Sequence, residues 1–182
     1  MPNSTLASDN VDYVYVGRAS GNIIHFATAI YEGTDVTSIP DILSKNDVST
    51  DQKYTIQDYK IDYTNFPRIP WEDFDFSYLL TSNKTFNYFT STGCTGSCTF
   101  CSWGGKHPWS RIPTNYVLDD IQYLVSKYNL SFIWFADSTF TANKNTNLEI
   151  AQGIIDRKID IAWRCHSRVL ELNKFNKEDL YF

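Results

Sequence analysis

The chain has 182 residues, of which 42% are hydrophobic and 16% aromatic, and its formal net charge is −5. This apolar content is enough for a packed core and excludes a disordered chain, while the acidic balance argues against a nucleic-acid-binding surface, which is usually basic. No apolar run approaches the ~18 residues that a membrane span needs, and residues 1–5 lack the basic and apolar regions of a signal peptide. Four cysteines without an export signal therefore predict a cytoplasmic protein whose thiols serve a metal rather than disulfides.

The first predicted elements are a strand and a helix. Residues 12–16 form a short run of β-branched and aromatic residues that ends at Gly17, which predicts a strand. Apolar residues recur on one helical face over residues 23–31, and Gly33 stands where a helix is commonly ended. One strand and one helix cannot form a core alone, so residues 11–33 are expected to be a packing appendage.

Residues 34–85 are predicted to be a connecting segment. They carry three prolines and many Asp and Asn residues, and no hydrophobic period persists. A stretch this long without regular structure is often a linker. We expect it to wrap the following domain and to be anchored there by its aromatic side chains, namely Phe66, Trp71, Phe74, Phe76 and Tyr78.

Strands and helices alternate in the rest of the chain. Residues 86–91 and the apolar run at residues 131–136 read as strands, and a helix with Thr114 as its N-cap is predicted to start at Asn115 between them. A capping box at Thr146 predicts the start of a second helix.

Residues 159–165 read as a third strand, and residues 176–179 as the start of a third helix. The order β-α-β-α-β-(α) predicts a parallel sheet with right-handed crossovers. In parallel barrels of this kind, functional groups lie on the loops that follow the carboxyl ends of the strands.

The loop after the first of these strands carries three of the four cysteines, in the order T-G-C-T-G-S-C-T-F-C. Cys94, Cys98 and Cys101 are spaced C-x3-C-x2-C, close enough to bind one compact inorganic centre. Iron–sulfur clusters normally take four thiolates, so a three-cysteine loop suggests a four-iron cluster with one open iron. Gly93 and Gly96 let the backbone bend and pass close to a bulky group.

Other interpretations of the loop are a structural zinc site, a disulfide and an electron carrier. Zinc sites typically use two ligand pairs, and neither His25, His107, His166 nor Cys165 forms a paired motif. A disulfide would leave an odd thiol among the three. An electron-transfer cluster would need Cys165 as its fourth ligand, although this residue ends a separate predicted strand and is expected to be a buried, free thiol.

The loop resembles the signature of the radical S-adenosylmethionine (radical SAM) enzymes, C-x3-C-x-aromatic-C, with Phe100 at the aromatic position. The resemblance implies that Cys94, Cys98 and Cys101 bind a 4Fe-4S cluster and that S-adenosylmethionine chelates the fourth iron. Reductive cleavage of the cofactor would then give a 5′-deoxyadenosyl radical that abstracts hydrogen from a substrate. It further implies an electron donor such as flavodoxin or ferredoxin, and methyl transfer or another radical modification as the outcome.

The same family implies the fold, a partial (β/α)6 TIM-like barrel. Residues 86–182 would hold its first three βα units, because an eight-stranded barrel takes ~250 residues and only 97 remain from Phe86. This predicts a truncated core. Residues 1–33 resemble the end of the Rossmann-like, cobalamin-binding domain of one subgroup. However, the D-x-H-x-x-G motif that ligates cobalamin is absent from the chain, so cobalamin binding is expected at most in a full-length relative.

The loops after the second and third strands supply the remaining candidates. Asp137, Ser138 and Thr139 stand where the family often carries Gly-Gly-Glu, which holds the amino group of S-adenosylmethionine. Asp137 could accept a hydrogen bond from that ammonium or bond only to nearby backbone. Arg168 is a candidate for binding a carboxylate, and His166 for proton transfer. Lys106 and Arg111 flank the cysteine loop, where they would meet an acidic electron donor or remain solvated.

Overall fold

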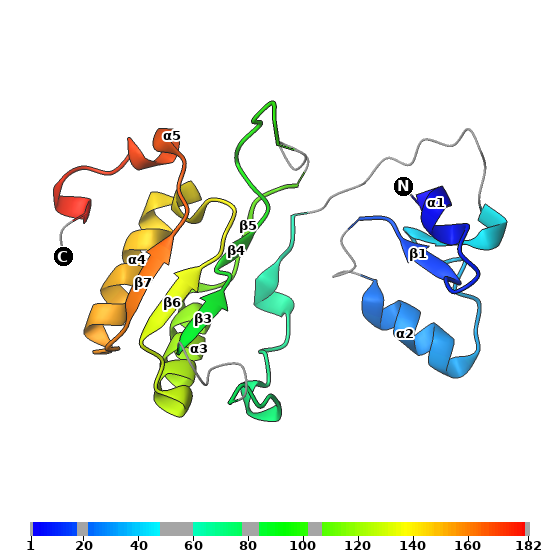
Figure 1. Ribbon diagram of the computed structural model, residues 1–182, viewed down its shortest axis with the longest axis horizontal. Coiled ribbons are helices and arrows are strands. Elements are labelled where there is room, and N and C mark those ends of the chain that lie inside the picture. The colour runs from blue at the N-terminus through cyan, green and yellow to red at the C-terminus, as the bar shows by residue number, and fades with distance from the viewer. Residues whose placement is uncertain (1, 18–21, 48–59, 78–83, 102–106, 181–182) are drawn as a thin grey trace. The chain divides into compact units, whose positions relative to one another are not determined.

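The computed structural model describes residues 2–17, 22–47, 60–77, 84–101 and 107–180 (Figure 1). The chain divides into two compact units, Met1–Tyr59 and Lys60–Phe182. The predicted division into residues 1–33, 34–85 and 86–182 stays a prediction. No helix within the described ranges combines the length and the apolar character that crossing a bilayer requires.

The first unit is built from a strand pair and a helix. Its elements are α1 (Pro2–Leu6), β1 (Tyr13–Tyr15), α2 (Ile23–Glu32), β2 (Ile42–Ser44) and the 3-10 turn η1 (Lys45–Asp47). The predicted strand and helix are both present, and α2 ends as expected at Gly33, which adopts a left-handed conformation with φ 67°. The sequence did not indicate β2, which pairs antiparallel with β1. A relation to a Rossmann-like domain stays a prediction.

The second unit contains the predicted alternation. Its elements are η2 (Tyr63–Asn65), η3 (Trp71–Asp73), β3 (Thr85–Tyr88), β4 (Ser91–Thr92), β5 (Ser110–Arg111), α3 (Thr114–Tyr128), β6 (Phe132–Phe135), η4 (Phe140–Ala142), α4 (Lys144–Asp156), β7 (Ala162–Cys165), α5 (Val169–Leu172) and η5 (Glu178–Leu180). β3, β6 and β7 form a parallel sheet in that order. The unit is thus a mixed α/β fold, and its described strands do not close into a barrel.

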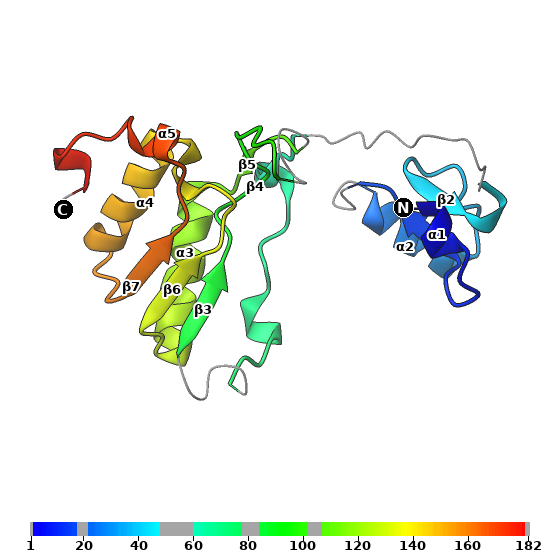
Figure 2. The same ribbon diagram turned by 45° about the horizontal axis from the view of Figure 1, so that its top comes forward.

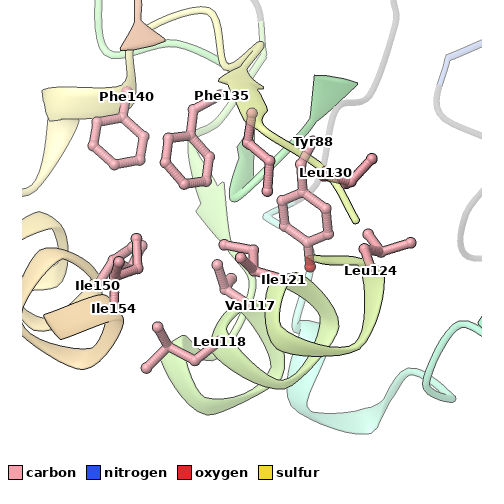
Figure 3. Close-up of a cluster of buried hydrophobic side chains, with 11 residues drawn as sticks. Tyr88, Val117, Leu118, Ile121, Leu124, Leu130, Phe135, Phe140, Ile150 and Ile154 are labelled. Atoms are coloured by element: carbon pink, nitrogen blue, oxygen red, sulfur yellow. The ribbon is translucent and has the colours of Figure 1, made fainter. Parts of the chain in front are cut away.

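Helices α3 and α4 lie on the same face of the three-stranded sheet (Figures 1 and 2). Alternate residues of the central strand, Ile133 and Phe135, are fully buried under them, as expected for a strand with a helix-covered face. Side chains from α3 and α4 complete this core (Figure 3). The ring of Phe140, just after β6, stacks on Phe135 with centroids 4.8 Å apart, which fixes the chain as it leaves the sheet.

Both helices start at residues other than the predicted ones. The N-cap of α3 is Pro113, and Thr114 is its first helical residue, with a hydroxyl that donates to Glu149 rather than to the helix. For α4, Asn143 has extended backbone geometry and accepts the N–H of Thr146, so the helix starts at Lys144. The capping-box assignment of Thr146 was therefore wrong by three residues, because an asparagine caps at least as well as a threonine.

Two further predictions, of a third helix and of the aromatic anchors, are only partly confirmed. The predicted third helix appears as the 3-10 turn η5, preceded by a short helix, α5, that the sequence analysis missed. Of the predicted anchors, Trp71 and Phe76 pack against the core. Phe66 and Phe74 are exposed, and Tyr78 lies outside the described residues.

A polar network under the sheet ties three segments together. The buried carboxylate of Asp120 on α3 accepts from the Tyr88 hydroxyl at 2.7 Å and from Arg68 at 2.6 Å. Burial, with the Asp120 charge adding to it, raises the pKa of the Tyr88 phenol, so Tyr88 remains a donor. The network therefore joins β3 and α3 to the segment that precedes them.

We predict that Tyr88→Phe lowers the free energy of unfolding by about 1–3 kcal/mol, because it leaves a buried carboxylate oxygen without its donor. Urea denaturation followed by tryptophan fluorescence measures this, since all five tryptophans lie in the second unit. Tyr128→Phe is the control. Its hydroxyl donates to the Phe74 carbonyl at an exposed position, so its loss should be at most about 1 kcal/mol. Equal losses would contradict a special role for the network.

Candidate functional site

The cysteine loop leaves the sheet at the carboxyl ends of its strands, where α5 also lies (Figures 1 and 2). Two short antiparallel strands hold its base, because β4 before the loop pairs with β5 after it. Next to this pair, the N–H of Cys94 donates to the His107 carbonyl at 3.2 Å. Gly93 has φ +80°, and a Cβ there would lie 2.2 Å from the Pro108 carbonyl oxygen. Only glycine fits this close crossing of the two loop ends.

The three thiols differ in their surroundings. Cys94 is partly buried, and its sulfur accepts the N–H of Gly96 at 3.3 Å and lies 3.4 Å from the hydroxyl of Thr139. Cys98 is also partly buried, and its carbonyl accepts the N–H of Cys101 in a tight turn. Cys101 is exposed, and the adjacent Phe100 is 91% exposed. The loop thus holds its first thiol firmly and presents its third to solvent.

Among the described residues, no three His, Cys, Asp or Glu side chains gather closely enough to hold a metal ion. The donor set nevertheless suits an iron–sulfur cluster, because it consists of three thiols in one loop, one of which already accepts a backbone N–H. Such hydrogen bonds to sulfur tune clusters. Metal sites commonly assemble as their ligands become ordered by the metal. The residues therefore fit a cluster, and closing the loop around it is the step that binding adds.

Asp137 is fully buried directly after β6. Its carboxylate accepts the N–H of Thr90 at 3.2 Å and the hydroxyls of Thr90 and Ser91 at 2.9 and 2.5 Å. These donors lie at least 46 residues away in the chain, so the alternative in which Asp137 bonds only to nearby backbone is excluded. The carboxylate fixes the residues that lead into the cysteine loop. The predicted contact of Asp137 with a cofactor ammonium stays a prediction.

The segment after β7 also contacts the cysteine loop. Glu171 on α5 is 5% exposed, and its Oε1 accepts from the Thr95 hydroxyl at 3.0 Å and from Arg168 at 3.3 Å. The Arg168 guanidinium lies against Gly96, where an added Cβ would come within 2.6 Å of Nη1. The carboxylate beside Arg168 is therefore the chain's own Glu171. Whether Arg168 also binds a cofactor stays a prediction.

The other candidates are spread around this end of the sheet. Ser138 is exposed, whereas Thr139 is buried beside Cys94. Cys165 ends β7 as a half-buried, free thiol, and burial, helped by the Asp137 charge, raises its pKa to about 11. Its place on a strand agrees with the prediction, whereas its burial is less complete than expected.

His166 is exposed, with its ring edge-on to Trp134, so no proton-transfer partner is evident from its described contacts. Arg111 on β5 contacts Thr146 and pairs with Glu149 at 3.9 Å. It is therefore not simply solvated. Lys106 lies outside the described residues.

Sequence reasoning missed several residues that shape the site. Thr90, Ser91 and Thr95 gave no signal, because hydroxyl residues are common in any loop. Glu171 could have been found from the sequence, because it follows Arg168 by three residues. This spacing brings opposite charges together on a helix. A charge-pair search around the predicted candidates would have found it.

No family model matches the chain. Over 92 residues, 49% of its length, it is 36% identical to an uncharacterized methyltransferase from Pyrococcus horikoshii, of which the match covers 19%. Over 86 residues, 47% of its length, it is 27% identical to the anaerobic magnesium-protoporphyrin IX monomethyl ester cyclase of Rubrivivax gelatinosus, of which the match covers 16%. The chain thus spans less than one fifth of the length of either relative. Both names are those of enzymes.

Because Asp137 is buried, we predict that its contribution to the stability of the fold depends on pH. Burial raises the pKa of its carboxyl, against the lowering effect of hydrogen bonds from Ser91 and Thr90. A carboxyl whose pKa is higher in the folded state contributes stability below its unfolded pKa of about 4, and that contribution is lost as the pH rises through the folded value. The stability of Asp137→Asn relative to the native chain should therefore increase as the pH rises above about 4.

Urea denaturation across this pH range measures the difference. Asp75→Asn is the matched control. Hydrogen bonds from the side chain and N–H of Ser77 lower the pKa of the exposed Asp75, so this variant should lose stability relative to the native chain as the pH rises. A pH-independent difference for Asp137→Asn would contradict the prediction.

Proposed function

We propose that the chain is part of a radical SAM enzyme in which Cys94, Cys98 and Cys101 hold a 4Fe-4S cluster. The observation that carries this is the C-x3-C-x2-C spacing, with Phe100 before the third cysteine, on the loop that follows the first strand of a parallel sheet. The open fourth iron is the proposed site for S-adenosylmethionine. When bound, these two groups supply one-electron cleavage of the sulfonium bond.

The two relatives support enzymatic chemistry of this kind. One is named as a methyltransferase and the other as a cyclase, and both matches cover about half of this chain. We take methyl transfer or another radical modification as the reaction, and a partner of the flavodoxin or ferredoxin type as the electron donor. The parallel sheet β3-β6-β7 is the proposed first half of a partial (β/α)6 barrel.

The chain's own residues supply position and shielding for this chemistry. The N–H of Gly96 and the hydroxyl of Thr139 lie at the Cys94 sulfur, where polar contacts moderate the charge of a thiolate ligand. Asp137 is fully buried and accepts hydrogen bonds from Thr90 and Ser91 at the start of the loop. Ser138 is exposed beside it, which makes it the more accessible candidate for contact with the cofactor.

Anaerobic reconstitution with iron and sulfide should give a brown protein that contains about four irons per chain. Changing Cys94, Cys98 or Cys101 to alanine should abolish most of this iron, since each thiolate is a ligand. Cys165→Ala is the control and should retain it, because Cys165 is a half-buried, protonated thiol on β7. Iron content and the visible spectrum provide the measurement.

Two outcomes would contradict the proposed centre. A colourless protein with stoichiometric zinc would identify a structural metal site. Loss of iron in Cys165→Ala would identify a four-cysteine, electron-transfer cluster without an open iron.

Addition of S-adenosylmethionine should change the electron paramagnetic resonance spectrum of the dithionite-reduced cluster, because its amino and carboxylate groups would become ligands of the open iron. The Cys165→Ala protein should show the same change. A spectrum that is unaltered at saturating S-adenosylmethionine would contradict the proposal even if the cluster itself is present.

A further inference from the structure

The segment between the first two cysteines contacts the ion pair of Arg168 and Glu171, which lies in a distant part of the chain. Thr95 and Gly96 contact Glu171 and Arg168, which lie more than 70 residues later, after β7. Both charged side chains are largely covered, Glu171 at 5% exposure and the Arg168 side chain at 26%. The contact therefore joins the loop after the third strand of the sheet to the loop after the first.

The side-chain hydrogen bonds of Glu171 all join it to Thr95 and Arg168 in the described part of the chain. Its Oε1 accepts from both Thr95 and Arg168. Its Oε2 is covered and has no partner among the residues that the structure describes. A covered carboxylate is costly unless its donors are present. The carboxylate thus holds Thr95 and Arg168 together, and loss of either donor would release it.

The position of Arg168 leaves room only for glycine at residue 96. A side chain at residue 96 would have its Cβ 2.6 Å from Nη1 and 2.8 Å from Cζ of Arg168. The guanidinium therefore occupies the space beside the same backbone N–H that donates to the Cys94 sulfur. A positive charge thus lies beside Gly96 and a negative charge beside Thr95, the two residues that follow Cys94.

We propose that Arg168 and Glu171 are positioning residues, which clamp Thr95 and Gly96 so that the Cys94 thiol is held in place, and whose charges set the reduction potential of the centre bound there. The electrostatic half of this inference rests on the proposed iron–sulfur function. The positioning half does not, because it concerns contacts present without a metal. The clamp also makes the cluster loop sensitive to the segment that follows β7.

The positioning half is tested on the metal-free protein by the rate at which iodoacetamide alkylates each cysteine, followed by mass spectrometry. Arg168→Gln, Glu171→Gln and Thr95→Val should each raise the Cys94 rate several-fold, because each removes part of the clamp. Thr95→Ser keeps the hydroxyl and should restore the native rate. Cys101 is already exposed and serves as the internal reference.

Arg157→Gln is the matched control. Arg157 also makes an ion pair, to Asp119 at 2.6 Å, and its side chain is 30% exposed, close to the 26% of Arg168. This variant should leave the Cys94 rate unchanged. Native Cys94 rates in Arg168→Gln, Glu171→Gln and Thr95→Val would overturn the positioning half, whether or not the chain binds a cluster.

The electrostatic half is tested by redox titration of the reconstituted cluster. A nearby cation stabilises the reduced, more negative state. Arg168→Gln should therefore lower the reduction potential and Glu171→Gln should raise it, with Arg157→Gln unchanged. Simple loosening of the loop would move both potentials in the same direction, and that result would overturn this half. A native chain that takes up no iron would instead refute the proposed function and leave the alkylation result to decide the clamp.

Discussion

The buried carboxylate of Asp137 is the interaction on which the candidate site depends. It stands at the end of the central strand and receives three hydrogen bonds from Thr90 and Ser91, the residues that lead into the cysteine loop. Burying a charge is unfavourable unless donors surround it. The buried position of Asp137 after β6 therefore depends on Thr90 and Ser91, and the conformation of these two residues depends on Asp137. The core beneath the sheet supplies the rigidity, because Phe135, two residues before Asp137, is fully enclosed.

The sheet explains why three distant segments meet at one end. β3, β6 and β7 run parallel, so their carboxyl ends lie at the same end of the sheet. The loops that follow these strands therefore begin next to one another. The first loop carries the thiols, the second carries Asp137 and Thr139, and the third carries Arg168 and Glu171. The contacts Cys94 to Thr139 and Thr95 to Glu171 follow from this arrangement.

Much of this fold could be predicted, because local patterns encode it. The apolar run of β6 and the glycine that ends α2 were read directly from the sequence. The N-caps Pro113 and Asn143 were missed by one and three residues, since several neighbouring residues can cap a helix. The two-residue pair β4–β5 is too short for a pattern. The partners of Asp137 and Thr95 lie 46 to 76 residues away, and only the folded chain reveals such contacts.

The cysteine loop combines a fixed beginning with an open end. The Cys94 sulfur accepts the N–H of Gly96 and lies near the Thr139 hydroxyl, and the backbone crossing at Gly93 precedes it, whereas Cys101 is exposed. A centre that binds three thiolates needs both properties. In the proposed iron–sulfur centre, a fixed first ligand would set the position of the cluster, and an accessible last ligand would leave room for iron and sulfide to enter. Thr95 and Gly96 lie between these two cysteines and contact Glu171 and Arg168, so a movement of the segment after β7 would reach the backbone that carries Cys94.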